Sequence, residues 1–292
     1  MNNSISITIG IPAYKEEAHI ARLLDNIITQ KKQNFNIKKI IVVSDSRVDK
    51  TNEIVERYKK KNVDLVINSK RKGQIFAQNL IFKKADSDLV ILFEADTYPK
   101  NKYYISRLIN PILKNKSIGM VQGYMKPLET KTLIQKVLNF QFKIYSNIIL
   151  NKKQTINPIP SGRGGRAFNK NLYLKLKWPA GVPEDEYAYL WCMKNKIEVV
   201  LERSAICYFS LPKKYSDYLK EFQKNRSAGI TIRKYFSHKI IKNNMSINFI
   251  KKIKILFSLI LNNPIYTIVY IFLITFANMQ TKKIEFTDYW IK

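Results

Sequence analysis

The chain has 292 residues, of which 46% are hydrophobic; this composition argues against wholesale disorder and fits one large α/β domain with an appendage. Its formal net charge of +29 favours anionic partners such as nucleic acid, acidic lipid headgroups or phosphorylated substrates, although lysine is abundant along the whole chain. The two cysteines and two histidines form no metal-binding pair, so we expect no structural zinc site and a reducing compartment. We expect no secretory signal peptide at the start.

Strands and helices alternate over the first third of the sequence. Residues 5–11 alternate between isoleucine and small or polar residues, and this period of two is typical of a strand. The apolar patterns that follow predict a helix at 20–27, a strand at 40–43, a helix around 54–58, a strand at 63–67, a helix at 73–84 and a strand at 89–93. Such alternation indicates an α/β fold with a mainly parallel, Rossmann-type sheet flanked by helices.

Polar segments follow each predicted strand. Ligands bind at the carboxyl ends of parallel strands, so we expect a site lined by residues 12–17, 44–49, 68–73 and 94–96. Glu94 and Asp96 can share one hard cation that bridges them to a pyrophosphate; alternatively they are ordinary surface acids. Asp45 can accept a hydrogen bond from a nucleotide base, or it caps a turn or helix.

The pattern changes after residue 116. Apolar periodicity predicts strands at 118–125, 197–201 and 205–209, helices at 133–150 and 215–235, and a loop rich in proline and glycine at 158–165. Glu184-Asp185-Glu186 opens a further helix, where one acid can act as a general base or all three can decorate the helix N-terminus. Gln223 and Arg226 share a helix face, where the arginine can grip a diphosphate or belong to a solvated basic face.

Seven motifs occur in an order that resembles the family 2 glycosyltransferases. They are residues 9–17 (IGIPAYKEE), 42–51 (VVSDSRVDKT), 73–79 (GQIFAQN), 94–99 (EADTYP), 161–168 (SGRGGRAF), 183–185 (PED) and 223–226 (QKNR). The resemblance covers about residues 5–235. It implies a GT-A fold and inverting transfer from a nucleotide-diphosphate sugar, a UDP- or GDP-sugar, with Mg²⁺ or Mn²⁺ as cofactor.

The resemblance also implies roles for particular residues. Asp185 matches the general base, and Asp96 would hold the metal together with Glu94, which faces the diphosphate side. The acceptor side is expected to include Ser161, Gly162, Arg163 and Glu184. The nucleotide-sugar donor is expected to contact Pro12, Ala13, Tyr14, Glu16, Asp45, Gly73, Asn79, Glu94, Gln223 and Arg226.

Several positions depart from the family pattern. Lys15 replaces the usual Asn, Ser44 replaces the first of two Asp, and Gln74 replaces the usual Lys. Glu94 replaces an Asp, which keeps the charge but lengthens the reach. Ser227 stands where the Trp of the QxxRW motif would stack on an acceptor sugar, and this argues against a processive polysaccharide synthase.

An apolar stretch near the C-terminus, residues 253–277, is interrupted by Asn262-Asn-Pro264. Each half is shorter than the roughly 20 residues that span a bilayer. Lysines flank the stretch, and basic flanks beside apolar helices favour an anionic membrane surface over packing on the catalytic domain alone. We therefore expect a catalytic domain at 1–235 and a helical, membrane-interacting tail at 236–292, located at the cytoplasmic face of a membrane as a peripheral, monotopic or single-span protein.

The sequence thus predicts metal-dependent, inverting sugar transfer to an acceptor hydroxyl on a lipid or glycan at the membrane. The alternative within the class is transfer to a polyprenyl or dolichyl phosphate, an acceptor that is already anionic and needs no base. A basic nucleic-acid-binding protein would explain the charge but not the acids at the strand ends, so we expect no nucleic-acid partner. A nucleotidyltransferase should carry a glycine-rich phosphate loop after the first strand, where residues 12–16 read PAYKE.

Overall fold

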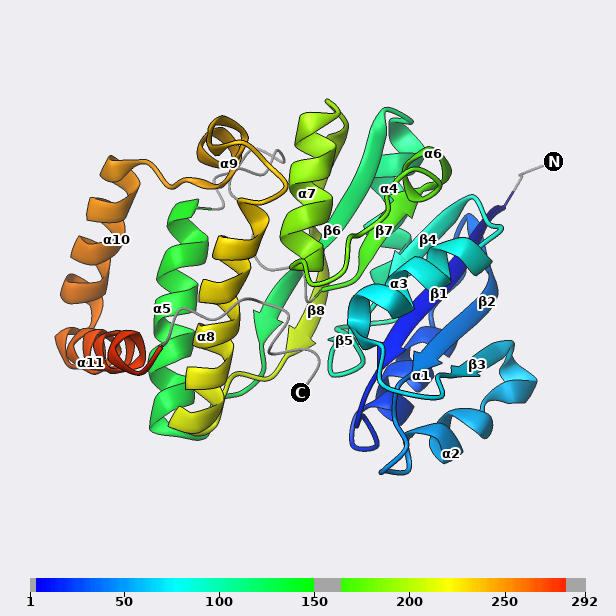
Figure 1. Ribbon diagram of the computed structural model, residues 1–292, viewed down its shortest axis with the longest axis horizontal. Coiled ribbons are helices and arrows are strands. Elements are labelled where there is room, and N and C mark those ends of the chain that lie inside the picture. Colours follow the sequence, from blue (N-terminus) through cyan, green and yellow to red (C-terminus); the bar gives the residue numbers. More distant parts are fainter. Residues whose placement is uncertain (1–3, 150–163, 282–292) are drawn as a thin grey trace.

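The first part of the fold is a parallel sheet with helices on both faces. The computed structural model describes residues 4–149 and 164–281. In chain order it begins with β1 (Ile5–Ala13), α1 (Ile20–Ile28), β2 (Phe35–Ser44), α2 (Thr51–Glu56), the 3₁₀ turn η1 (Lys59–Lys61), β3 (Val63–Ile67), α3 (Gly73–Lys84) and β4 (Leu89–Leu92). The four strands lie in the order β3-β2-β1-β4, and each neighbouring pair is parallel. Their carboxyl ends therefore meet at one edge of the sheet (Figure 1).

The second part extends the same sheet with strands of mixed direction. The elements are β5 (Tyr98–Pro99), α4 (Tyr104–Lys114), β6 (Ile118–Pro127), α5 (Leu133–Ile149), β7 (Arg166–Asn169), α6 (Lys170–Tyr173), α7 (Glu184–Lys194), β8 (Glu198–Phe209) and α8 (Tyr215–Ile232). The strand order continues from β4 as β7-β6-β8-β5. β7 is antiparallel to both β4 and β6, whereas β8 runs parallel to β6. The eight strands form one sheet of the α/β class expected from the sequence, but the uninterrupted parallel pairing is confined to β3-β2-β1-β4.

Two apolar layers hold helices on opposite faces of this sheet. One layer joins the central strands to α1 and α4, with Leu24 and Leu108 fully buried. The other joins them to α3 and α7 through Ile81 and Tyr189, and Trp178 is buried among the same side chains. β1 is buried on both faces. Its isoleucines Ile7, Ile9 and Ile11 all belong to the first layer, whereas Gly10 faces Ile81 of α3 on the opposite side.

The structure differs from the sequence prediction in its strand and helix boundaries. Pro12 does not end the first strand, because it lies in register with Val43 of β2 and β1 continues to Ala13. The two strands expected at 197–201 and 205–209 are one strand, β8, whose pairing with β6 shifts between Gly123 and Tyr124. The sequence prediction omitted α4, β5, β7 and α6, of which β5, β7 and α6 are four residues long or shorter.

Three helices complete the described chain: α9 (His238–Met245), α10 (Phe249–Asn262) and α11 (Pro264–Gln280). α9 packs on α7 of the catalytic core, although the sequence assigned it to the tail. α10 and α11 pack on α5, and α11 also contacts α8. The helix break falls at Asn263, which caps α11 by accepting a hydrogen bond from the Tyr266 amide.

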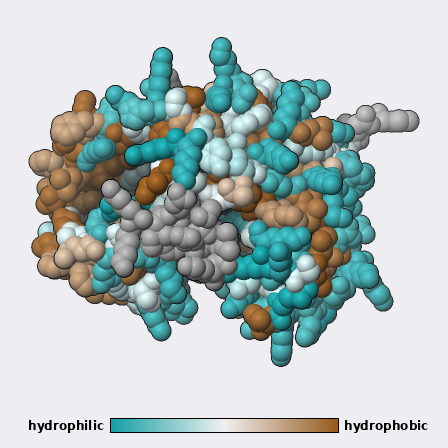
Figure 2. Space-filling view, viewed as in Figure 1, coloured by the Kyte–Doolittle hydropathy of each residue, from teal (hydrophilic) through white to brown (hydrophobic). Residues whose placement is uncertain are grey.

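The outer surface of α10 and α11 is apolar. Brown, hydrophobic side chains gather at this end of the molecule (Figure 2). Phe249, Leu261, Ile265 and Phe272 each expose at least 70% of their surface. Within residues 4–149 and 164–281, no helix has the length and hydropathy needed to cross a membrane.

Candidate active site

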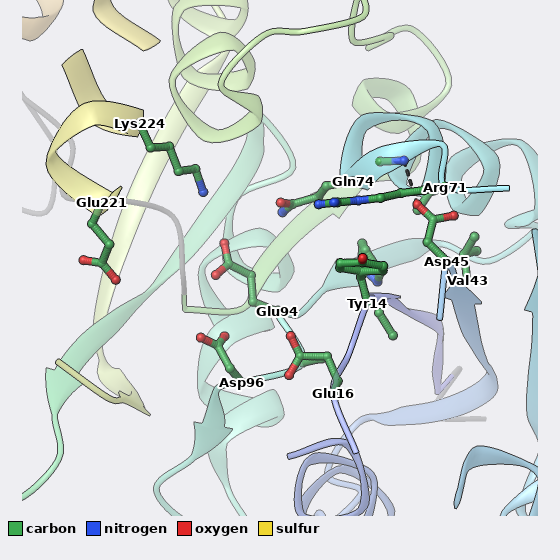
Figure 3. Close-up of a pocket in the computed structure, with 15 residues that line it drawn as sticks. Tyr14, Glu16, Val43, Asp45, Arg71, Gln74, Glu94, Asp96, Glu221 and Lys224 are labelled. Atoms are coloured by element: carbon green, nitrogen blue, oxygen red, sulfur yellow. Dashed lines mark hydrogen bonds between the residues drawn. The ribbon is translucent and has the colours of Figure 1, made fainter. Parts of the chain in front are cut away.

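A cavity of about 270 Å³ lies at the carboxyl ends of β1, β2 and β4. One wall comes from the segments that follow these strands, a second from the N-terminal turns of α3, and a third from α8 (Figure 3). The cavity thus lies at the sheet edge that the polar strand ends predict. Its lining residues are Pro12, Ala13, Tyr14, Glu16, Val43, Asp45, Arg71, Gly73, Gln74, Ala77, Glu94, Ala95, Asp96, Glu221 and Lys224.

The Asp45 carboxylate fixes the loop that leads into α3. It accepts hydrogen bonds from the Asn68 side chain at 2.7 Å and from the backbone amides of Lys72 at 3.0 Å and Gly73 at 2.6 Å. Gly73 adopts a φ of +83°, a conformation that favours glycine, and this allows its amide to face Asp45. Asp45 thus holds the loop that forms one side of the cavity.

An arginine and a tyrosine stack beside this loop. The Arg71 guanidinium lies over the Tyr14 ring at 3.9 Å from the ring centroid, and both side chains line the cavity (Figure 3). A flat cationic and aromatic pair of this kind offers stacking and charge to a planar anionic ligand such as a nucleotide.

Three carboxylates face the floor of the cavity. Glu16, Glu94 and Asp96 lie near one another, with the Glu94 carboxylate turned toward Lys224 (Figure 3). Burial, followed by the charges of Asp96 and Glu94, raises the pKa of Glu16 to about 8. A bound cation would lower this mutual repulsion. In the described part of the chain no group of three or more Asp, Glu, His or Cys residues is arranged as a complete metal site. Mg²⁺ is, however, usually bound by one or two carboxylates, and substrate phosphates supply further ligands.

The first turn of α7 adjoins the cavity through Glu184. This carboxylate is only 5% exposed and accepts a hydrogen bond from Gln74 Nε2 at 2.9 Å, so it is tied to a residue of the cavity wall. The buried Arg166 lies 3.9 Å from the same oxygen. Burial, and then the charge of Asp185, raises the pKa of Glu184, while Arg166 and Lys224 act in the opposite direction.

Asp185 lies at the same helix start. Its Oδ1 accepts a hydrogen bond from the Glu186 backbone amide at 2.8 Å, which orients the carboxylate within the first turn of α7. It does not line the cavity itself, but the neighbouring Glu184 is bonded to the wall residue Gln74. Asp185 is therefore held next to the cavity, on the side of α7.

Most of the residues predicted to bind the nucleotide sugar line the cavity. This holds for Pro12, Ala13, Tyr14, Glu16, Asp45, Gly73 and Glu94, and Asp96, which was predicted to hold the metal, lines the cavity as well. Asn79 does not, because its side-chain amide both donates to and accepts from the backbone of Trp178, at 2.8 and 3.1 Å. The structure thus gives Asn79 a packing role. Ser161, Gly162 and Arg163 lie outside the described residues.

The α8 residues that line the cavity differ from the two that the sequence motif predicts. Glu221 and Lys224 face it, whereas Gln223 and Arg226 hydrogen-bond to α11. The sequence prediction included Arg71 only as part of the strand-end segment 68–73, without a role of its own. It missed Glu221 and Lys224, because nothing in the basic sequence of α8 distinguishes Lys224 from its neighbours.

The fold is that of a GT-A glycosyltransferase. The chain belongs to glycosyl transferase family 2, because the sequence model of that family matches residues 8–175, more than half of the chain. The solved structures that resemble it are consistent with this assignment. The mannosyltransferase PcManGT from Pyrobaculum calidifontis, in complex with GDP-Man and Mn²⁺, aligns with a TM-score of 0.63 at 17% identity, covering 94% of this chain and 76% of that one. Staphylococcus aureus TarS 1-349 with UDP-GlcNAc aligns with a TM-score of 0.56 at 18% identity, covering 86% and 70%.

Curated relatives carry related names. A dolichyl N-acetyl-alpha-D-glucosaminyl phosphate 3-beta-D-2,3-diacetamido-2,3-dideoxy-beta-D-glucuronosyltransferase of Methanococcus voltae is 33% identical over 103 residues, which are 33% of this chain and 31% of the relative. A poly-beta-1,6-N-acetyl-D-glucosamine synthase of S. aureus is 22% identical over 242 residues, which are 79% and 57%. The chain therefore spans about a third to rather more than half of the length of these relatives.

Proposed function

We propose that this protein transfers a sugar from a UDP- or GDP-sugar to an acceptor hydroxyl, with inversion at the anomeric carbon. The observation that carries the proposal is the cavity at the carboxyl ends of β1, β2 and β4, where the stacked pair of Tyr14 and Arg71 lies on one side and the acids Glu94 and Asp96 on the other. This arrangement suits a ligand with a planar base at one end and a diphosphate at the other.

The nucleotide end of the donor is assigned to the Asp45 side of the cavity. Tyr14 and Arg71 stack on or beside the base, while the loop fixed by Asp45 supports the α3 end of the wall. Pro12, Ala13 and Gly73 bring backbone close to the ligand in the same region. The structures with GDP-Man and UDP-GlcNAc make nucleotide sugars the natural donors to test.

Asp96, with Glu94, would hold Mg²⁺ or Mn²⁺ at the diphosphate end. The raised pKa of Glu16 supports this assignment, because its proton is held by burial and by the negative charges of Asp96 and Glu94. With a divalent ion bound, Asp96 and Glu94 would place positive charge beside the departing diphosphate. The P. calidifontis mannosyltransferase was crystallised with Mn²⁺.

Asp185 is the proposed general base. It takes the proton from the acceptor hydroxyl while the acceptor oxygen forms a bond to the anomeric carbon. The bond from that carbon to the diphosphate oxygen breaks, and the nucleoside diphosphate leaves with the electron pair. Because attack and departure occur on opposite faces in one displacement, the anomeric configuration inverts. The hydrogen bond from the Glu186 amide holds the Asp185 carboxylate for this role.

The acceptor is proposed to be a lipid or glycan at the cytoplasmic face of a membrane. The support is the exposed apolar surface of α10 and α11, beside which Lys251, Lys252 and Lys254 add positive charge. Apolar side chains with basic neighbours suit an anionic bilayer surface. α10 and α11 would then lie on the membrane, and the cavity would open near lipid-linked acceptors.

The proposal is tested by screening UDP- and GDP-sugars for hydrolysis and transfer with purified protein, Mn²⁺ and lipid-linked acceptors. We expect one donor to be turned over, and the product of transfer to carry the inverted anomeric configuration. A retained configuration would contradict single displacement. If the protein instead transfers the sugar to a polyprenyl phosphate, and this transfer does not depend on Asp185, then the acceptor group is a phosphate and not a hydroxyl.

A further inference from the structure

Helix α8 presents two different faces to its surroundings. Glu221 and Lys224 are three residues apart and share one face, and so do Gln223 and Arg226. Two residues along an α-helix are separated by about 200°, so Lys224 and Arg226 point in nearly opposite directions. A ligand that contacts one of these faces cannot contact the other without a rotation of the helix.

The first face forms the third wall of the cavity. Glu221 and Lys224 line it, and the Lys224 side chain extends toward Glu94 and Gln74 (Figure 3). The positive charge of Lys224 acts on this region, because it opposes the rise in the pKa of Glu184. Lys224 thus places a cation across the cavity from the nucleotide side.

The second face is fastened to the C-terminal end of α11. Arg226 Nη1 donates a hydrogen bond to Asn278 Oδ1, and Gln223 Nε2 donates to the Gln280 carbonyl at 3.4 Å. The Tyr215 hydroxyl bonds the Gln280 side chain at 3.3 Å, so three residues of α8 contact this end of α11. A helix C-terminus favours a nearby cation, which suits Arg226.

The charges of the cavity create a need for such a cation. A nucleotide-sugar donor carries a diphosphate, and its negative charge grows on the leaving oxygen as the sugar departs. Glu94 and Asp96 repel this group unless cations offset their charge. A lysine ammonium is a compact charge that binds phosphate well. Lys224 is the cation that α8 supplies at the cavity.

We infer that Lys224 contacts the donor diphosphate, and that Gln223 and Arg226 are positioning residues that fasten α8 to α11 and so hold Lys224 in place. This inference rests on the proposed function, since it assumes a nucleotide-diphosphate donor. It replaces the direct contact between Arg226 and the diphosphate that the sequence motif predicts. It also links the helices that carry the exposed apolar surface to the donor cavity.

The experiment compares variants of the full chain by steady-state turnover of the donor and by nucleoside diphosphate binding in Mn²⁺. Lys224→Met should lower turnover by on the order of a hundredfold, the usual loss when one charge-stabilising group is removed. Lys224→Arg should restore much of it. Lys220→Met, an exposed lysine one turn away on the same helix, is the matched control and should have no effect. Unchanged turnover and binding in Lys224→Met would overturn the inference.

The positioning role is tested with Arg226→Met, Asn278→Ala and the double variant. Because the two residues act through one contact, each single change should cost less than Lys224→Met, both should cost a similar amount, and the double variant should be no worse than either. The same non-additivity should be seen in the thermal midpoint of unfolding. If Arg226→Met is as damaging as Lys224→Met while Asn278→Ala has no effect, Arg226 contacts the donor and the inference is wrong.

Failure of the inference and failure of the proposed function give different results. If the wild type turns over no nucleotide sugar and binds no nucleoside diphosphate, the proposed function is wrong and the role of Lys224 falls with it. If the wild type is active and the variants do not rank as stated, only the assignment on α8 is wrong.

Discussion

The cavity has two kinds of wall, and they are held in place by different parts of the molecule. The nucleotide wall is built from strand ends, where Asp45 bonds the neighbouring loop and Tyr14 follows β1 directly. The α8 wall is a single helix whose direction is set by its contacts with α11. A sheet edge fixes its side chains locally, whereas a helix wall depends on packing between segments about fifty residues apart. Substitutions should therefore act on the first wall one contact at a time, and on the second through the position of a whole helix.

The largest effect is expected at Asp185, which lies next to the cavity in the first turn of α7. Asp185→Asn is nearly isosteric, and an asparagine oxygen can still accept the Glu186 amide hydrogen bond, so the fold should be kept. Loss of a positioned base should lower turnover by about a hundred- to ten-thousandfold, with donor affinity close to normal. The measurement is kcat beside donor Kd. Asp217→Asn, in the exposed first turn of α8, is the matched control. If Asp185→Asn loses donor affinity instead of turnover, Asp185 contacts the nucleotide or the metal and is not the general base.

The helical end of the molecule should lose membrane affinity when its charge is removed. Changing Lys251, Lys252 and Lys254 to glutamine should weaken binding to anionic vesicles by roughly a hundredfold, at about 1 kcal/mol per lysine. Binding to neutral vesicles should change little. The measurement is vesicle co-sedimentation at low and high salt. If the wild type ignores anionic vesicles altogether, the membrane proposal is wrong.

The nucleotide wall should respond to a smaller, local change. Arg71→Ala removes the stack on Tyr14 and should weaken donor affinity by about tenfold, which corresponds to a cation–π contact of roughly 1–2 kcal/mol. Turnover at saturating donor should stay near normal. Arg22→Ala is the matched control, because Arg22 stacks on Tyr98 at 3.5 Å but does not line the cavity. If the two variants change donor affinity equally, Arg71 does not contact the donor.

The smallest expected effect is a change in how stability depends on pH. Burial, and then the charges of Asp185 and Glu184, raises the pKa of Glu186 to about 8. Between about pH 4.5 and pH 8 the folded protein thus holds a proton on Glu186 that the unfolded chain releases near the ordinary glutamate pKa of 4.5. The stabilisation that comes from this bound proton is fully present below about pH 4.5 and is lost as the pH rises through about 8. Glu186→Gln should be more stable relative to wild type at pH 9 than at pH 6, as read from thermal midpoints, while the exposed Glu129→Gln should show no such difference.

The sequence predicted the parallel part of the sheet well because apolar strands and polar strand ends follow local patterns. β3 and α3 have the predicted boundaries, and the predicted strand ends supply Tyr14, Asp45 and Asp96 to the cavity. The role of Asn79 could not be read locally, since its partner Trp178 is 99 residues away. The sequence could not predict which way the Arg226 side chain points for the same reason, because its hydrogen-bond partner lies in α11. A helical pattern predicts that a helix forms, but not which face meets the site.

Binding of the donor in the presence and absence of a divalent metal tests the central claim most directly. Calorimetric titration of wild type and Asp96→Asn with UDP- and GDP-sugars, in Mn²⁺ and then in excess chelator, measures whether the carboxylates at the end of β4 hold a metal for a nucleotide-diphosphate ligand. The account predicts that the wild type binds one donor tightly only when the metal is present. It also predicts that Asp96→Asn keeps its thermal midpoint but loses the metal-dependent gain in affinity. Equal donor binding in excess chelator, or undiminished metal-dependent binding by Asp96→Asn, would contradict it.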